Sequence, residues 1–196
     1  SRTGQILNRT DLAAPLGVSI PTLSEWIRIL EVTSQILLVP PYYENFGKRL
    51  IKSPKLYFMD PGLACHLLGI DSARQLERST FLGPLFEGWL ASEIVKRQVN
   101  AGRRRELYFF RDQQGLEVDF LIPGRSGRLV LAEAKASRTV TPSMAGPLKR
   151  LAASIPRHRV SACIVHRPAP GGAAGSHVLS PGVRAYPIRE FLETLR

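Results

Sequence analysis

The chain has 196 residues, of which 44% are apolar, 22% charged and 8% aromatic. This composition excludes a largely disordered chain, a collagen and a coiled coil, and the length suffices for one large domain or two small ones. The formal charge of +11 favours a nucleic acid or another polyanion as the binding partner.

Several features of the sequence bear on its cellular location. The longest uncharged apolar run, at residues 36–41, is far shorter than the roughly 20 residues of a membrane span, so we expect no membrane association. No charged leader followed by an apolar segment is evident. Cys65 and Cys163 are too few and too far apart for a disulfide framework or a zinc site, which favours the cytoplasm. Because the chain starts at Ser1 instead of Met, we expect it to be part of a longer protein.

Residues 1–70 are predicted to form a small winged-helix-like unit. A helix over residues 10–16 ends at Gly17, and Pro21 suits the first turn of a second helix. Apolar residues recur at helical spacing in that second helix, at Leu23, Trp26, Ile27 and Leu30. Extended runs at residues 36–39 and 55–59 flank a loop over residues 40–47 and would form the hairpin, and a turn follows at residues 60–62. The exposed positions of the second helix favour docking or a structural role over direct reading of bases; they are Thr22, Ser24, Glu25 and Arg28.

A linker over residues 71–80, helical in part, leads to the second unit at residues 81–196. The pattern predicts a helix over residues 81–100, three strands, a helix over residues 143–154, another strand and a closing helix over residues 187–195. The four predicted strands cover residues 106–111, 116–122, 129–136 and 160–165. A loop is expected over residues 168–176. The order α-β-β-β-α-β indicates an α/β domain around a mixed sheet.

Charged side chains interrupt two of these predicted strands. Glu117 and Asp119 alternate with apolar residues, which would place Leu121 on their face and Phe120 with Val118 on the other. Glu133 and Lys135 alternate in the same way. A turn centred near Arg125 would put Asp119 opposite Leu131 and all four charged residues on one face, although a slip of one residue would separate them. An ordinary amphipathic sheet is the alternative, but flanking helices and the poor strand propensity of Asp and Glu favour a functional cluster.

The spacing of Asp119, thirteen intervening residues and Glu133-Ala134-Lys135 resembles the signature of the PD-(D/E)xK, or restriction-endonuclease-like, superfamily. Over nearly its whole length the chain more closely resembles the carboxy-terminal part of a prokaryotic AAA-type ATPase family of unsettled function. In that family a winged helix lies between the ATPase and the nuclease-like domain. The segments that carry this resemblance are PKLYFMDPG at residues 54–62, LFEGW at 85–89, YFFR at 108–111, LEVDFL at 116–121 and EAK at 133–135.

The resemblance implies a nuclease site that uses Mg²⁺ or Mn²⁺. Asp119, Glu133 and the carbonyl of Ala134 would bind the metal, Lys135 would orient water or stabilise charge on phosphorus, and Glu87 would complete the site. Glu93 lies nearer the centre of the apolar arc of its helix and is the rival for that last role. The sequence departs from the superfamily pattern in having Val118 where the name-giving Pro stands, and in lacking a Gln or Tyr on the helix after the third strand.

Basic residues next to the proposed site are predicted to bind nucleic acid: Arg103, Arg104, Arg105 and Arg111. No phosphate-binding Gly-rich loop with Lys occurs, so we expect no ATP site here and an ATPase module upstream. The four histidines have no mutual metal-ligand spacing and are interpreted as surface or packing residues. We therefore expect a nucleic-acid-binding, Mg²⁺-dependent nuclease, and the sequence leaves open whether it forms an oligomer. The alternative is a catalytically inactive module of the same fold that docks nucleic acid or protein for the ATPase.

Overall fold

The computed structural model describes residues 2–42, 51–168 and 175–195, so the predicted loops at residues 40–47 and 168–176 lie partly outside the described residues. It confirms a mixed α/β protein. The described residues form two sheets, one of three strands in the N-terminal part and one of six strands in the remainder. Within the described ranges, no helix combines the length and the apolar character needed to cross a membrane.

The N-terminal part pairs two helices with the smaller sheet. Its elements are β1 (Gln5–Ile6), α1 (Arg9–Leu16), α2 (Ile20–Val32), β2 (Ile36–Val39) and β3 (Lys55–Phe58). Gly17 ends α1 as predicted, with φ 63°, and the side chains of Asn8 and Ser19 accept backbone N–H bonds at the two N-termini. β3 lies in the middle of the sheet, antiparallel to both β1 and β2.

A helix begins where only a turn was predicted. Asp60 accepts hydrogen bonds from the N–H groups of Gly62 and Leu63, and Pro61 takes the first helical position of α3 (Pro61–Leu67). The Asp-Pro pair therefore starts a helix here, because the Asp caps the free N–H groups and the Pro ring suits the first turn. The predicted linker is helical in part, at α4 (Ala73–Arg78).

The larger sheet has the strand order β4-β5-β6-β7-β9-β8. Its elements, with the helices that cover it, are α5 (Leu82–Asn100), β4 (Tyr108–Arg111), β5 (Glu117–Pro123), the 3₁₀ turn η1 (Arg125–Gly127), β6 (Arg128–Lys135), the 3₁₀ turn η2 (Pro142–Ala145), α6 (Gly146–Ser154), β7 (Arg159–His166), β8 (His177–Ser180), β9 (Val183–Pro187) and α7 (Ile188–Thr194). β6, β7 and β9 are parallel neighbours, and the other pairs are antiparallel. The sheet is therefore mixed, as expected.

The sequence reading missed β8 and β9, so the expectation of four strands in this sheet was too low. These two strands are short, and they flank a tight turn in which Gly182 has φ 78°. A Pro-Gly step between short, partly charged segments resembles a loop in the sequence, and only pairing with β7 makes the segment a strand.

The alternation predicted for β5 is also wrong at one point. Tyr108 pairs with Leu121 while Phe110 pairs with Val118, so β5 has one residue more than β4 between these pairs. This bulge puts Val118 and Leu121 in the same buried cluster, whereas Phe120 packs in the other. The register with β6 differs as well, because Leu121, not Asp119, lies opposite Leu131. The observed pairing of β5 with β6 is therefore shifted by two residues from the predicted one.

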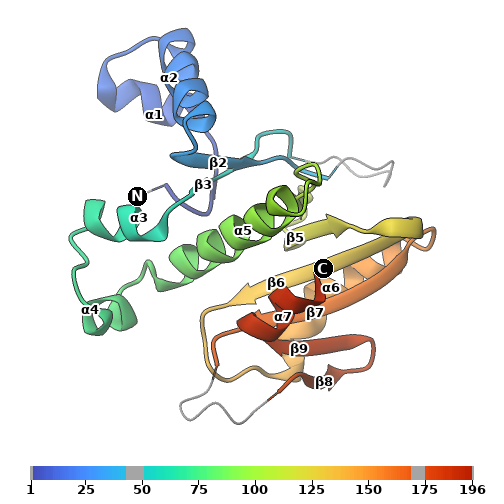
Figure 1. Cartoon of the computed structure of the whole chain (residues 1–196). Helices are drawn as coiled ribbons and strands as arrows, with labels where there is room; N and C mark the ends of the chain where they lie inside the picture. The colour runs from blue at the N-terminus through green and yellow to red at the C-terminus, as the bar shows by residue number, and fades with distance from the viewer. Residues whose placement is uncertain (1, 43–50, 169–174, 196) are drawn as a thin grey trace.

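Two hydrophobic cores lie on opposite faces of the sheet. One contains Phe86 and Leu90 of α5 with Phe191 of α7, and the other contains Leu148 and Leu151 of α6. Figure 1 shows α7 and α6 on opposite sides of the sheet, which gives three layers, helix, sheet and helix.

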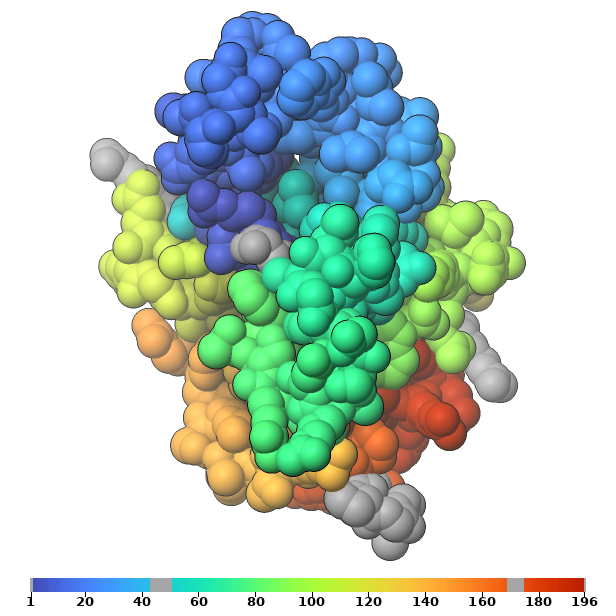
Figure 2. Space-filling model, turned by 90° about the vertical axis from the view of Figure 1, so that its left-hand side faces the viewer, coloured from blue at the N-terminus to red at the C-terminus, as the bar shows by residue number. Residues whose placement is uncertain are grey.

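The N-terminal part shares the first of these cores. Leu37, Val39 and Tyr57 are buried together with residues of α5 and of the larger sheet. The backbones also meet, since the N–H of Tyr42 donates to the carbonyl of Phe109 at 2.7 Å. Figure 1 shows α5 running between the N-terminal strands and the larger sheet, and Figure 2 shows α1 and α2 at one end of the molecule and the C-terminal elements at the other. β3 is consequently fixed against α5 and the edge of the larger sheet.

Candidate functional site

Charged side chains from α5, β3, β5 and β6 meet beside the first residues of β5 and the last residues of β6. We call this group the acid–lysine cluster. Its members are Lys55, Glu87, Glu117, Asp119, Glu133 and Lys135. The structure thus brings together all four residues predicted to be catalytic and Glu117, which was predicted to share their sheet face, and it adds Lys55.

Lys55 lies at the centre of three of the carboxylates. Its side-chain nitrogen Nζ is 2.6 Å from Glu117, 2.9 Å from Glu87 and 3.3 Å from Asp119. The residue is only 2% exposed. Burial alone would lower the pKa of Lys55, but the neighbouring carboxylates outweigh it and the pKa is raised, so the side chain is a permanent cation.

Glu87 has a second partner from the same strand. The hydroxyl of Tyr57, which is fully buried, donates to Oε1 of Glu87 at 2.5 Å, and the same oxygen accepts from Lys55. Burial and the nearby Asp119 raise the pKa of Glu87 to about 7, against the opposing effects of Lys55 and Tyr57. Glu93, the rival acid of the sequence reading, instead pairs with Lys96 at 3.0 Å near the surface.

The adjacent ends of β5 and β6 connect Asp119 to the Glu-Ala-Lys segment. Oδ2 of Asp119 accepts a hydrogen bond from the backbone N–H of Ala134 at 3.0 Å. Lys135 Nζ lies 2.9 Å from Oε1 of Glu133, and a third of its side chain is exposed. The ammonium of Lys135 can therefore contact a bound molecule from solvent while it remains paired with the buried Glu133.

Glu133 has one carboxylate oxygen that lacks a partner. Its Oε2 is buried and has no hydrogen-bond partner in the described residues. Burial and the charge of Asp119 raise the pKa of Glu133 to about 7, although Lys135 opposes this. A buried carboxyl group with a pKa near 7 can hold a proton or bind a cation close to neutral pH, and groups of this kind are common in catalytic and binding sites.

In the part of the chain that the structure describes, no group of three or more His, Cys, Asp or Glu side chains is arranged to hold a metal ion. The carboxylates of Glu87, Glu117 and Asp119 all contact Lys55. Within the described residues, Glu133 has a buried oxygen without a partner, and Asp119, whose contact with Lys55 is the longest of the three at 3.3 Å, lies next to it. Oxygen donors of this kind match Mg²⁺, which keeps several waters and uses one or two carboxylates. The residues present therefore fit one such ion at Asp119 and Glu133, and do not fit one bound by Glu87 as the sequence reading expected.

The predicted nucleic-acid-binding arginines differ in their surroundings. Arg111 pairs with Glu117 at 3.2 Å and so borders the acid–lysine cluster. Arg103 donates to the carbonyl of Leu195, and Arg105 contacts Glu31 of α2 and the carbonyl of Leu38. Arg104 is exposed.

Lys55 and Tyr57 are the residues that sequence reasoning missed. Their signal is a lysine at the start of the apolar strand Lys55-Leu56-Tyr57-Phe58, which would need an acidic partner if the strand is buried. His166, interpreted from the sequence as a surface or packing residue, is also close, because it pairs with Lys135 in the β6–β7 register. Its ring is buried, and Nδ1–H donates to the carbonyl of Arg167.

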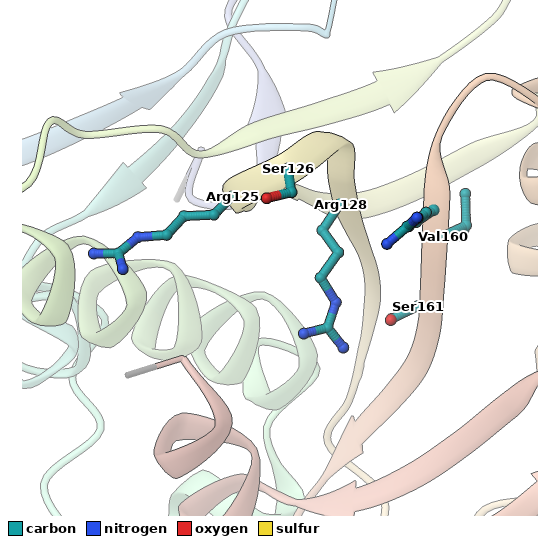
Figure 3. A pocket seen from close by; sticks show the side chains of 6 residues that line it. Arg125, Ser126, Arg128, Val160 and Ser161 are labelled. Carbon is teal, nitrogen blue, oxygen red and sulfur yellow. The ribbon is translucent and has the colours of Figure 1, made fainter.

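A hollow of about 430 Å³ lies away from this cluster, at the η1 turn and the first residues of β6 and β7. It is lined by Arg125, Ser126, Arg128, Arg159, Val160 and Ser161. Figure 3 shows that the side chains of Arg125 and Arg128 diverge, so they do not form a common anion-binding fork. The hollow is separated from Lys135 by the length of β6.

Two family models match the chain. A domain of unknown function (DUF8612) matches residues 1–74, and another domain of unknown function (DUF4143) matches residues 82–191. The uncharacterized proteins Rv2008c of Mycobacterium tuberculosis and Mb2031c of Mycobacterium bovis are each 34% identical over 146 residues. That alignment covers 74% of this chain and 32% of each relative, so the chain spans about a third of the length of the relatives it matches.

Proposed function

We propose that this chain, which belongs to the DUF4143 family, binds nucleic acid and hydrolyses its phosphodiester bonds at the acid–lysine cluster. The observation that carries the proposal is the contact between Asp119 at the start of β5 and the Glu133-Ala134-Lys135 segment at the end of β6. Two carboxylates and a partly exposed lysine at adjacent strand ends form a site that can bind a cation and a phosphate together.

Asp119 and Glu133, with the carbonyl of Ala134, would hold Mg²⁺ or Mn²⁺. When bound, the ion would polarise a phosphate oxygen and lower the pKa of a bound water. Lys135 is held by Glu133 and would donate to a phosphate oxygen, where it stabilises the charge that develops in the transition state. Glu87 would act through Lys55 and Tyr57, both of which it contacts, and not as a ligand.

The path of the nucleic acid follows from the arginines. Arg104 is exposed, and Arg111 borders the cluster through Glu117. We propose that these two contact phosphates of the bound strand, since phosphate contacts position a nucleic acid without reading its sequence. Arg103 and Arg105 are held by Leu195 and Glu31, which lie outside the acid–lysine cluster, and would contribute less.

The finer assignment of the fold belongs to the same proposal. The succession α5-β4-β5-β6-α6-β7 supports a restriction-endonuclease-like core in residues 81–196. The pair α1–α2 followed by the β2–β3 hairpin supports a winged helix in residues 1–70. We further propose that an AAA-type ATPase module precedes this segment in the whole protein, for which the greater length of the relatives leaves room.

One observation favours the second candidate function, a catalytically inactive module that docks nucleic acid or protein. Lys55 already forms ion pairs with Glu87, Glu117 and Asp119, at 2.6 to 3.3 Å. A cluster whose carboxylates are satisfied internally can also be a purely structural element.

A cleavage assay separates the two functions. The chain is incubated with single- and double-stranded DNA and RNA in Mg²⁺, Mn²⁺ or EDTA, alongside Asp119→Ala, Lys135→Met and the surface control Lys96→Met. Metal-dependent cleavage is expected for the parent and the control. Lys135→Met should lose at least about 100-fold in rate, because one charge-stabilising donor is removed, while its melting temperature changes little. Cleavage by none of the proteins, or equal cleavage by all four, would refute the nuclease proposal.

A further inference from the structure

The side chain of Lys55 is a buried cation on a strand that is hydrogen-bonded on both sides. It projects from β3, the central strand of the smaller sheet, whose residues Lys55 and Leu56 pair with both neighbouring strands. The ammonium lies 5.6 Å from the centre of the buried ring of Phe109. An ammonium has three N–H donors, and Lys55 has three carboxylate partners, Glu87, Glu117 and Asp119. Its bonding capacity is thus fully used inside the protein.

A metal ion bound by the same oxygens would occupy the same space. Mg²⁺ lies about 2.1 Å from its oxygen ligands, whereas Nζ of Lys55 is 2.6 to 3.3 Å from the three carboxylates. The centre of such an ion would fall within the volume of the ammonium group. Lys55 and a metal ion on Glu87 and Glu117 therefore exclude each other.

The charge balance also makes a second ion less favourable while Lys55 is present. Four carboxylates face three cations, Lys55, Lys135 and Arg111, which leaves a formal charge of −1. A single divalent ion at Asp119 and Glu133 would bring the charge to +1, and a second one would bring it to +3. Without Lys55 the cluster would carry −2, so the first divalent ion would bring it to 0 and a second one to +2 instead of +3. Many phosphodiester-cleaving sites use two such ions about 4 Å apart.

We propose that the ammonium of Lys55 takes the place of a second divalent cation, so that β3 completes the site and the cluster binds at most one metal ion. This inference rests on the proposed function for the first ion at Asp119 and Glu133, but it concerns the carboxylates of Glu87 and Glu117, which that ion does not use. It makes the N-terminal part a contributor to the site: the nuclease-like domain by itself would lack one of its cations.

The test is a calorimetric titration of Mn²⁺ into the parent chain, Lys55→Met and the control Lys96→Met. Met preserves most of the packing of the lysine stem and removes the charge. Lys96 is also paired with a glutamate, but on the surface, so its replacement controls for the loss of a lysine in general. The number of Mn²⁺ ions bound by Lys55→Met should exceed that of the parent by one, while Lys96→Met should equal the parent.

The outcomes separate this inference from the proposed function. One ion bound by the parent and two by Lys55→Met support both the role of Lys55 and the proposed function. No ion bound by the parent and one by Lys55→Met supports the role of Lys55 and refutes the metal site at Asp119 and Glu133. One ion in both proteins overturns the role of Lys55 only, and none in either overturns both. If Lys55→Met is unfolded without metal, because three carboxylates lose their partner, circular dichroism during the same titration should show that Mn²⁺ restores the native signal. Failure to restore it at saturating Mn²⁺ overturns the inference.

Discussion

The hydrogen bond from Tyr57 to Glu87 offers a direct measurement of how firmly the acid–lysine cluster is held. Replacing Tyr57 by Phe removes one hydroxyl from a fully buried ring and leaves the ring packing unchanged. A hydrogen bond to a charged group contributes about 1.5–3 kcal/mol. Because Glu87 still has Lys55 at 2.9 Å, we expect the lower part of this range, about 1.5–2 kcal/mol. For a chain of this size the melting temperature should fall by about 3–8 °C.

The effect of Tyr57→Phe should depend on pH in a defined direction. The pKa of Glu87 is raised to about 7, so its contribution to stability is present below the unfolded pKa near 4.5 and is lost as the pH rises through 7. Tyr57 stabilises the ionised carboxylate and opposes this rise. Removing the hydroxyl should therefore lower the free energy of unfolding more at about pH 8, where Glu87 is ionised, than at about pH 5.5.

Urea unfolding at both pH values measures these differences. The matched control is Tyr186→Phe, a half-buried tyrosine whose hydroxyl has no hydrogen bond in the described residues; its unfolding free energy should change by less than about 0.5 kcal/mol. A change of that small size for Tyr57→Phe at about pH 8, or a larger loss at about pH 5.5, would show that the hydroxyl does not stabilise an ionised Glu87.

Two further outcomes are expected. A Cβ at Gly88 would lie 3.3 Å from Cδ1 of Tyr57, so Gly88→Ala should lower the free energy of unfolding by about 1 kcal/mol. Gly83→Ala, whose Cβ would meet nothing within 4 Å, should raise the free energy of unfolding. A stabilised Gly88→Ala protein in urea unfolding would contradict the packing described for α5. Arg104→Ala should weaken nucleic-acid binding and reduce the salt dependence of the binding constant by about 1 in log–log slope, without changing the melting temperature. Arg105→Ala loses contacts to Glu31 and Leu38, so it should mainly lower the free energy of unfolding, by about 0.5–1 kcal/mol. The reverse pattern in fluorescence anisotropy and thermal melts would count against the proposed path of the nucleic acid.

The parts of the site that the sequence predicted are those with a local signal. Asp119, Glu133 and Lys135 are charged residues inside apolar strands, and that pattern is readable without knowing the fold. Lys55 lies 64 residues before Asp119, and its role depends on where β3 packs. A lysine in an apolar strand indicates that an acidic partner is needed, but the sequence does not show which carboxylate that partner is.

Much of the fold was also readable, for physical reasons that differ between elements. Gly17 after the first helix and Pro21 at the start of the second made these two helices clear. The bulge in β5 left no trace in the sequence, because hydrophobic alternation continues through it and only the pairing with β4 reveals the additional residue. β8 and β9 depend on their pairing with each other and with β7, so no property of their own segment predicts them.

The core shared by the N-terminal strands and α5 bears on how this protein can evolve. Tyr57 and Val39 are buried against residues of the second matched segment, and the cluster takes its charges from both segments. An ancestor that acquired one segment without the other would have exposed apolar surface and left carboxylates unpaired. We therefore expect the segments at residues 1–74 and 82–191 to be inherited as a pair, with substitutions at Lys55 accompanied by changes at Glu87 or Glu117.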